Sequence, residues 1–127
     1  MPDSFEREMN PENIKKAEMV VCIPSYKEAD AIRYPTTQAD KGLQKYFSEV
    51  ESVIINCDNN SPDHTREAFL ETPTQTPKIY ISTEPGLKGK GNNFKNLFQK
   101  VVDLKAKAVV VVDADLKSIT PEWIKHL

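Results

Sequence analysis

Four short apolar runs recur along the chain, at residues 19–23, 52–57, 78–82 and 108–112. Each run has five or six residues, and most are rich in Val and Ile, so the pattern favours strands over helices. The runs at 19–23 and 108–112 are continuously apolar, which predicts strands covered on both faces. The run at 78–82 is more mixed, and we expect it nearer an edge of the sheet.

Amphipathic stretches lie between these runs. The clearest covers residues 93–104, in which apolar side chains recur at helical spacing. Residues 37–47 and 62–70 predict two more helices, and we expect Ser61 and Asp63 to act as helix N-cap residues of the second. A last helix is expected from Thr120 onward. The alternation of strand and helix predicts an α/β fold with a parallel sheet and right-handed crossovers.

The segment before the first strand is more polar. Within it, Asn10, Pro11 and Glu12 form the sequence of a helix start: an N-cap side chain, a proline at the first position and an acid in the first turn. We therefore expect residues 1–18 to be an N-terminal extension with a short helix, and residues 19–127 to form the main domain.

Composition narrows the class of protein. The chain has 127 residues, of which 39% are hydrophobic and 28% charged, with a net charge of −2. The near-neutral charge provides no general excess of positive charge for binding nucleic acid or an anionic membrane. The longest unbroken apolar run has five residues, against roughly 20 for a membrane-spanning helix. The first ten residues carry several charges and no signal peptide, and Cys22 and Cys57 lie in apolar segments, so we expect a soluble, cytoplasmic, single-domain protein.

Polar residues follow each of the four predicted strands. In parallel α/β sheets, ligands bind at the carboxyl ends of the strands, so these segments are the candidate site. Carboxylates, amides, lysines and glycines occur there together, and this joint occurrence is harder to attribute to chance than any one of them. The segments are residues 24–28, 58–63, 84–91 and 113–115.

Asp113-Ala114-Asp115 is the most specific of these motifs. Residues two apart that leave a strand point the same way, so both carboxylates can face one hard cation. Mg²⁺ and Mn²⁺ take oxygen ligands and are usually shared with substrate phosphates. The alternative is a pair of acids that only caps the strand end.

The segment 86–91 holds three of the four glycines, with Lys88 and Lys90 between them. Glycine allows a close approach of the backbone to a phosphate, and lysine supplies a positive charge. The spacing is not that of a Walker A loop, and a flexible surface turn is the alternative. Glu28 and Asp58 could each accept hydrogen bonds from a ribose or a base edge.

Taken together, the four segments resemble the nucleotide-sugar half of a GT-A glycosyltransferase, particularly of family 2. The family's Pro-x-x-Asn-Glu corresponds to residues 24–28, its Asp-Asp-x-Ser-x-Asp-x-Thr to 58–65, its Gly-Lys-Gly to 89–91 and its DxD to 113–115. The stretch 113–123 resembles most the group of glucosyl-phosphoglycerate and mannosylglycerate synthases. The resemblance covers residues 19–127 and implies a Rossmann-like parallel sheet with strand order 3-2-1-4, truncated after the DxD motif.

The resemblance also implies roles for individual residues. Pro24, Tyr26 and Glu28 would hold the nucleoside, with Asp58 and Asn59 near the base. Lys90 would neutralise the diphosphate, and Asp113 and Asp115 would bind Mg²⁺ or Mn²⁺. The implied partners are a UDP- or GDP-sugar and a small-molecule or glycan acceptor.

Two departures from the family pattern affect these expectations. Lys27 replaces the usual asparagine, and Asn59 replaces the second acid of its pair, so the choice of base is open. Only twelve residues follow Asp115, whereas in the family the acceptor site and any catalytic base follow the DxD. We therefore expect the 127-residue chain to bind donor but to transfer sugar weakly or not at all.

The implied strand order places residues 108–112 at an open edge. An apolar edge strand invites pairing with another chain, so we expect self-association there. Two alternatives to a glycosyltransferase remain at this point. One is a haloacid-dehalogenase-like phosphatase, although Lys117 stands where that family has Thr or Val, and the other is a non-catalytic nucleotide-binding or interaction module.

Overall fold

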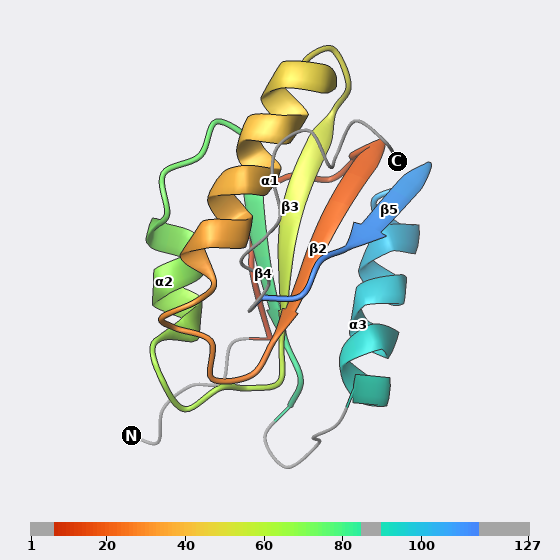
Figure 1. Cartoon of the computed structure of the whole chain (residues 1–127). Coiled ribbons are helices and arrows are strands. Elements are labelled where there is room, and N and C mark those ends of the chain that lie inside the picture. Colours follow the sequence, from red (N-terminus) through yellow and green to blue (C-terminus); the bar gives the residue numbers. More distant parts are fainter. Residues whose placement is uncertain (1–6, 85–89, 115–127) are drawn as a thin grey trace.

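The computed structural model describes residues 7–84 and 90–114 (Figure 1). Strands and helices alternate along this part of the chain, as the apolar pattern predicts. In chain order they are β1 (Glu8–Met9), β2 (Met19–Ser25), α1 (Arg33–Tyr46), β3 (Ser52–Asp58), α2 (Thr65–Glu71), β4 (Lys78–Ser82), α3 (Lys90–Asp103) and β5 (Ala108–Val111).

The strands form one five-stranded sheet in the order β1-β4-β3-β2-β5. The four predicted strands are parallel and lie in the expected relative order, which confirms an α/β fold with a mostly parallel sheet. β1 adds an antiparallel edge strand that the sequence did not predict, because two residues are too few to show a pattern. β4 lies one strand in from that edge, and all five of its residues are buried.

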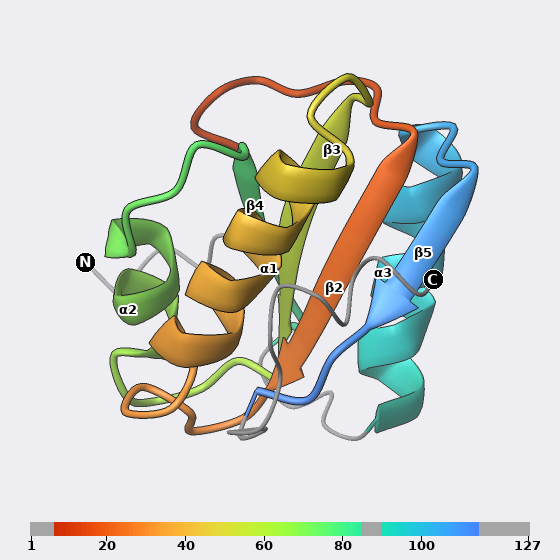
Figure 2. The ribbon, with the colours of Figure 1, turned by 45° about the horizontal axis from the view of Figure 1, so that its top comes forward.

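Helices cover both faces of the sheet, α1 and α2 on one face and α3 on the other (Figure 2). Side chains of β2 alternate between these layers: Val21 shares a buried cluster with Leu43 of α1, and Cys22 shares one with Leu97 of α3. Because both of its faces are covered, β2 is apolar at successive positions, as strands of parallel sheets commonly are.

The prediction that the strand at 108–112 is covered on both faces is wrong. Val110 is buried in the cluster beneath α1, but Val109 and Val111 on the opposite face are 37% and 42% exposed. The register pairs Val109 with Val20 and Val111 with Cys22, so these two valines lie on the α3 side. α3 packs over β2, β3 and β4 instead, which leaves that face of the edge strand open.

The predicted helix between residues 10 and 18 is also wrong, since this segment contains no helix. The Asn10 side chain accepts a hydrogen bond from the Ile14 N–H (2.9 Å) and donates one to the Ile14 carbonyl (2.8 Å), which closes a turn. Asn13 has a left-handed backbone with φ 53°, which no α-helix accommodates. The residues that resemble a helix start therefore form a turn between β1 and β2.

The three described helices occur where amphipathic stretches predicted them, with different starts. α1 begins four residues before the predicted Thr37, and α3 three before Asn93. α2 begins at Thr65 rather than at Pro62, and the proposed N-cap Ser61 belongs to the preceding loop. The helix expected from Thr120 lies outside the described residues. In the described part of the chain, none of the helices has the length and apolar character needed to span a bilayer.

Candidate functional site

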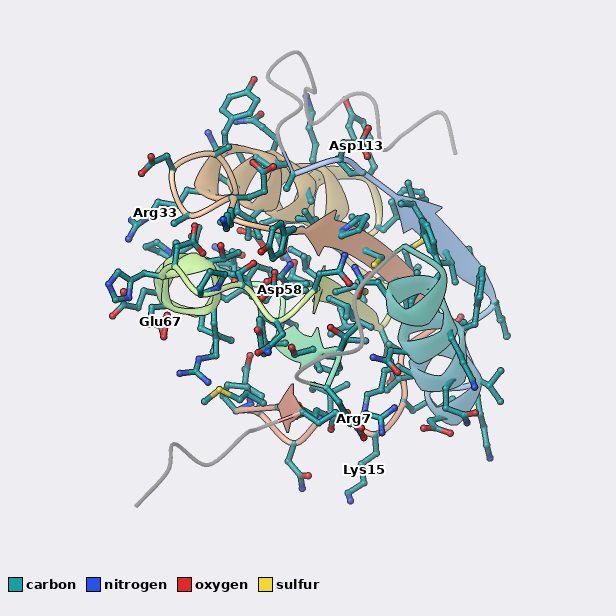
Figure 3. The ribbon with its side chains drawn as sticks, turned by 90° about the horizontal axis from the view of Figure 1, so that it is seen from below. Arg7, Lys15, Arg33, Asp58, Glu67 and Asp113 are labelled. Carbon is teal, nitrogen blue, oxygen red and sulfur yellow. The ribbon has the colours of Figure 1, made fainter. Side chains whose placement is uncertain are left out.

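A cavity of about 200 Å³ lies at the carboxyl ends of the parallel strands, the end that faces the viewer in Figure 3. Small-molecule sites usually enclose about 300–1,000 Å³, so these walls suit one part of a larger ligand. The wall contains two carboxylates, two amides, two hydroxyl groups and two aromatic rings. Its residues are Pro24, Ser25, Tyr26, Glu28, Asn59, Asn93, Phe94, Asp113 and Ala114.

Most of the described residues that the sequence analysis predicts as site residues line this cavity. Pro24, Tyr26 and Glu28 come from the end of β2 and the loop after it, Asn59 follows β3, and Asp113 follows β5. They are far apart in sequence, but β2 is paired with both β3 and β5, which brings the ends of these strands together. The parallel topology is therefore what assembles the cavity.

The loop after β2 is fastened to the loop after β3. Three successive backbone N–H groups of the first loop donate to side-chain oxygens of residues 61–65, in the second loop and at the start of α2, so the positions of Tyr26 and Glu28 depend on these residues. The three bonds run from Lys27 to Ser61 Oγ (2.8 Å), from Glu28 to Thr65 Oγ1 (3.0 Å) and from Ala29 to Asp63 Oδ2 (3.4 Å).

Lys27 stands at a position with unusual backbone geometry. Its φ of 56° lies in the left-handed region, which asparagine adopts more readily than lysine. The asparagine of the family pattern thus suits this backbone, and here the bond to Ser61 holds lysine in the same conformation. The Lys27 ammonium lies 5.3 Å from the centre of the Tyr26 ring, a cation–π distance that helps to orient this cavity residue.

Asp58 lies behind the cavity wall, near the middle of the sheet in Figure 3. It is fully buried and accepts four hydrogen bonds, so its carboxylate positions its neighbours and is not exposed to a ligand. Burial, followed by the charge of Asp58, raises the pKa of the Tyr80 hydroxyl, which therefore stays protonated as a donor. The four donors are Ser25 Oγ (2.8 Å), Ser61 Oγ (2.6 Å), Ser61 N (2.8 Å) and Tyr80 OH (2.8 Å).

Asn93 and Phe94 line the cavity, and no sequence pattern predicted this. Both lie in the first turns of α3, where the sequence indicated only a helix. Asn93 reaches the site through a hydrogen bond from its Nδ2 to the Cys57 carbonyl (2.6 Å), a contact between residues 36 positions apart. No local pattern carries information about such a contact.

Asp113 is the described residue best placed to hold a metal ion. It is exposed and shares the cavity wall with Glu28, and carboxylate oxygens suit hard divalent cations. Among residues 7–84 and 90–114, no three His, Cys, Asp or Glu side chains come together as a metal site. A cation at Asp113 would therefore need further ligands, such as phosphate oxygens.

The other predicted phosphate and metal residues are only partly accounted for. Asp115 and residues 86–89 lie outside the described part of the chain. Lys90 begins α3, which follows β4 after the glycine-containing segment, and the structure describes its backbone only. Their roles at the site stay predictions.

A parallel sheet with a cavity at its strand ends is the arrangement of Rossmann-like nucleotide-binding folds. No family model matches the sequence. Among solved structures, the fold is similar to that of glucosyl-3-phosphoglycerate synthase from Mycobacterium tuberculosis, a GT-A type protein, with a TM-score of 0.62 and 19% sequence identity. The crystal structure of that synthase is a complex with Mn²⁺, UDP-glucose and phosphoglyceric acid. The match covers 87% of this chain and 38% of the synthase, so it supports a GT-A-like fold over part of that protein's length.

Proposed function

We propose that the chain is the donor-binding portion of a glycosyltransferase, which binds a nucleotide-diphosphate sugar with a divalent metal and takes part in transfer of the sugar to an acceptor. The observation that carries this proposal is the convergence of residues from the ends of β2, β3 and β5 on one cavity. The similarity to a GT-A type synthase supports it.

The chemistry of the wall suits a nucleoside. Oxygen acceptors predominate among its polar groups, and the hydroxyl and N–H groups of a nucleoside are the donors that such oxygens bind. Tyr26 and Phe94 add aromatic surface on which a base or sugar can pack. No described residue of the wall is a cation, so a diphosphate would need its positive charge from elsewhere.

We assign that charge to the metal and to Lys90. Asp113 and Asp115 would hold Mg²⁺ or Mn²⁺, and Lys90, at the start of α3, would lie beside the diphosphate. A divalent cation stabilises the negative charge that gathers on a departing nucleoside diphosphate. Asp58 contributes indirectly, because it fixes Ser25 at the end of β2 and Ser61, whose hydroxyl holds the loop that carries Tyr26 and Glu28. Transfer to the acceptor would be weak or absent in this chain alone.

Calorimetric titration tests this proposal. UDP-, GDP- and ADP-sugars are titrated into the chain with and without Mn²⁺, and we expect one of them to bind only with the metal. Asp113→Asn should weaken this binding by at least about tenfold, because it removes a charged metal ligand. Asp103→Asn is the matched control, since Asp103 is an exposed aspartate on α3 outside the cavity.

The alternative functions give different outcomes. Release of phosphate from small phosphoesters would favour a phosphatase of the haloacid-dehalogenase type. Absence of binding by every nucleotide sugar would favour an interaction module. Metal-independent binding that Asp113→Asn leaves unchanged would contradict the assignment of the metal site.

A further inference from the structure

Asn93 carries a buried hydrogen-bond acceptor whose orientation is fixed. The residue is 4% exposed, and its Nδ2 donates to the Cys57 carbonyl at 2.6 Å. A carbonyl oxygen can only accept, so the amide cannot be turned over without losing this bond. Its Oδ1 therefore points away from Cys57, and among the residues that the structure describes this buried atom has no hydrogen-bond partner.

Asn59 places a second buried side-chain oxygen at the cavity wall. Its Oδ1 also has no hydrogen-bond partner within residues 7–84 and 90–114, and its backbone N–H donates to the Ser25 carbonyl at 3.0 Å. Asn59 follows Cys57 by two residues, and Asn93 is bonded to Cys57, so both amides belong to the β3 side of the cavity. Three other buried side-chain atoms of the described residues also lack hydrogen-bond partners, but only those of Asn59 and Asn93 belong to residues that line the cavity. A buried acceptor without a donor is costly, so a ligand in the cavity is suited to supply the donors for these two.

We propose that Asn93 and Asn59 together recognise two neighbouring hydrogen-bond donors on the nucleoside of the donor substrate. This inference rests on the proposed function and adds a specificity-determining residue, Asn93, to its site. Two parts of a nucleotide carry adjacent donors: the 2′,3′-diol of the ribose, and the edge of guanine with its N1–H and N2–H₂ groups. Uracil offers a single N–H, so it cannot satisfy both amides by itself.

Ligand analogues and an Asn93 variant test the proposal in combination. Dissociation constants are measured with Mn²⁺ for GDP, UDP, IDP, which lacks the guanine amino group, and the 2′-deoxy and 3′-deoxy forms of GDP. In the wild-type chain, removal of the donor that meets Asn93 should weaken binding by about threefold to tenfold. In Asn93→Ala the same removal should change binding by less than about twofold. A loss of affinity with IDP identifies the base as the group that meets Asn93, and a loss of affinity with a deoxy form identifies the ribose.

Asn96→Ala is the matched control. Asn96 lies on the same helix and also donates to a strand carbonyl, that of Ser82 (3.3 Å), but its Oδ1 already accepts from Arg7 (2.8 Å). This variant should keep the wild-type response to every analogue. Asn93→Ser replaces Asn93→Ala if thermal unfolding shows that the alanine variant is not folded.

Two results would overturn the inference, and they are distinguishable. If nucleotides bind but each analogue changes the affinity of the wild type and the Asn93 variant by the same factor, Asn93 does not read the nucleoside. If no nucleotide binds the wild-type chain, the proposed function itself fails.

Discussion

At the scale of single residues, Asp63 is a strong link between the two loops that shape the cavity. Its carboxylate accepts from the N–H (3.1 Å) and hydroxyl of Thr65 and from the N–H of Ala29. Partial burial acts to raise the pKa of Asp63, but these hydrogen bonds outweigh it and lower the pKa below its ordinary value of 3.8. The ionised form is therefore the one that stabilises the folded chain.

This lowered pKa predicts a pH dependence. Because the folded pKa lies below the unfolded one, the contribution of Asp63 is complete above pH 3.8 and is lost as the pH falls through the folded value. Asp63→Asn should melt at a lower temperature than the wild type at pH 7, by roughly 2–4 °C. Melting curves measured from pH 7 down to acid pH should show the difference in melting temperature between the two proteins shrinking below pH 3.8. A difference that stays constant would contradict the role of the carboxylate.

The loop residues also show where local sequence signals mislead. Ser61 and Asp63 have the residue types and the position of helix N-caps, and the sequence predicts that use. In the structure both bind the loop after β2, more than 30 residues earlier, and α2 starts only at Thr65. A cap and a cross-loop bond use the same side-chain chemistry, so only the tertiary contact separates the two.

At the scale of elements, Lys78 joins β4 to the end of α2. Its buried ammonium donates to the carbonyls of Phe69 (3.0 Å), Leu70 (2.8 Å) and Thr72. The last carbonyls of a helix have no partner within the helix, and a cation there also complements the helix dipole. Lys78 thus fixes where α2 ends against the sheet.

Removing this ammonium should destabilise the chain. Lys78→Met keeps most of the side-chain volume but leaves three carbonyls without their charged donor, and we expect a loss of about 2 kcal/mol in the free energy of unfolding. Urea titration followed by circular dichroism measures it. Lys41→Met, an exposed lysine on α1, should change stability by less than about 0.5 kcal/mol. Equal stabilities of the two variants would contradict the role given to Lys78.

The elements differ in how far the sequence predicts them. β2 is recognisable because burial on both faces favours an unbroken apolar run, and β3 and β4 because Val, Ile and Tyr predominate in them, and both signals are local properties of the sequence. The conformation of the segment 10–18 is not predictable in this way, because the Asn10 side chain that suggests a helix closes a turn instead. β1 gives no signal, since its place in the sheet is set by pairing with β4 far along the chain.

At the scale of the whole molecule, one edge of the sheet is open and apolar. The N–H groups of Ala108 and Val112 donate to the carbonyls of Glu18, just before β2, and of Cys22 within it. Those of Val109 and Val111 therefore face away from β2. The exposed side chains of Phe98 (60%) and Val102 (69%) lie on α3, which runs beside β5 in Figure 2. Within the part of the chain that the structure describes, no strand pairs with the outer side of β5, so its backbone and side chains can meet another chain.

We predict that a second copy pairs with this edge, β5 against β5, in an antiparallel two-fold arrangement. Sedimentation velocity over a range of concentrations should show the mass of the wild-type chain rising toward that of a dimer. The double variant Val109→Lys, Val111→Lys should stay monomeric, whereas Tyr34→Lys, on α1, should behave as the wild type does. A wild-type chain that is monomeric at every concentration would contradict this prediction.

The site was predictable from the sequence only where strand ends define it. Pro24, Tyr26, Glu28, Asn59 and Asp113 follow apolar runs, and the parallel topology brings such positions together. Other features depend on tertiary contacts that no local pattern encodes: Asp58 is enclosed by hydroxyl groups from three segments, and Asn93 is placed by its bond to β3.

The position of a bound metal and nucleotide tests the proposed site most directly. Mn²⁺ is paramagnetic and broadens the NMR signals of nearby amides, so UDP or GDP with Mn²⁺ is added to the isotopically labelled chain. We predict broadening at Glu28, Asp113 and Ala114, and none at Glu18 and Lys107, at the opposite ends of the strands. Broadening centred elsewhere, or spectra unchanged by nucleotide and metal, would contradict a nucleotide-sugar site in this cavity.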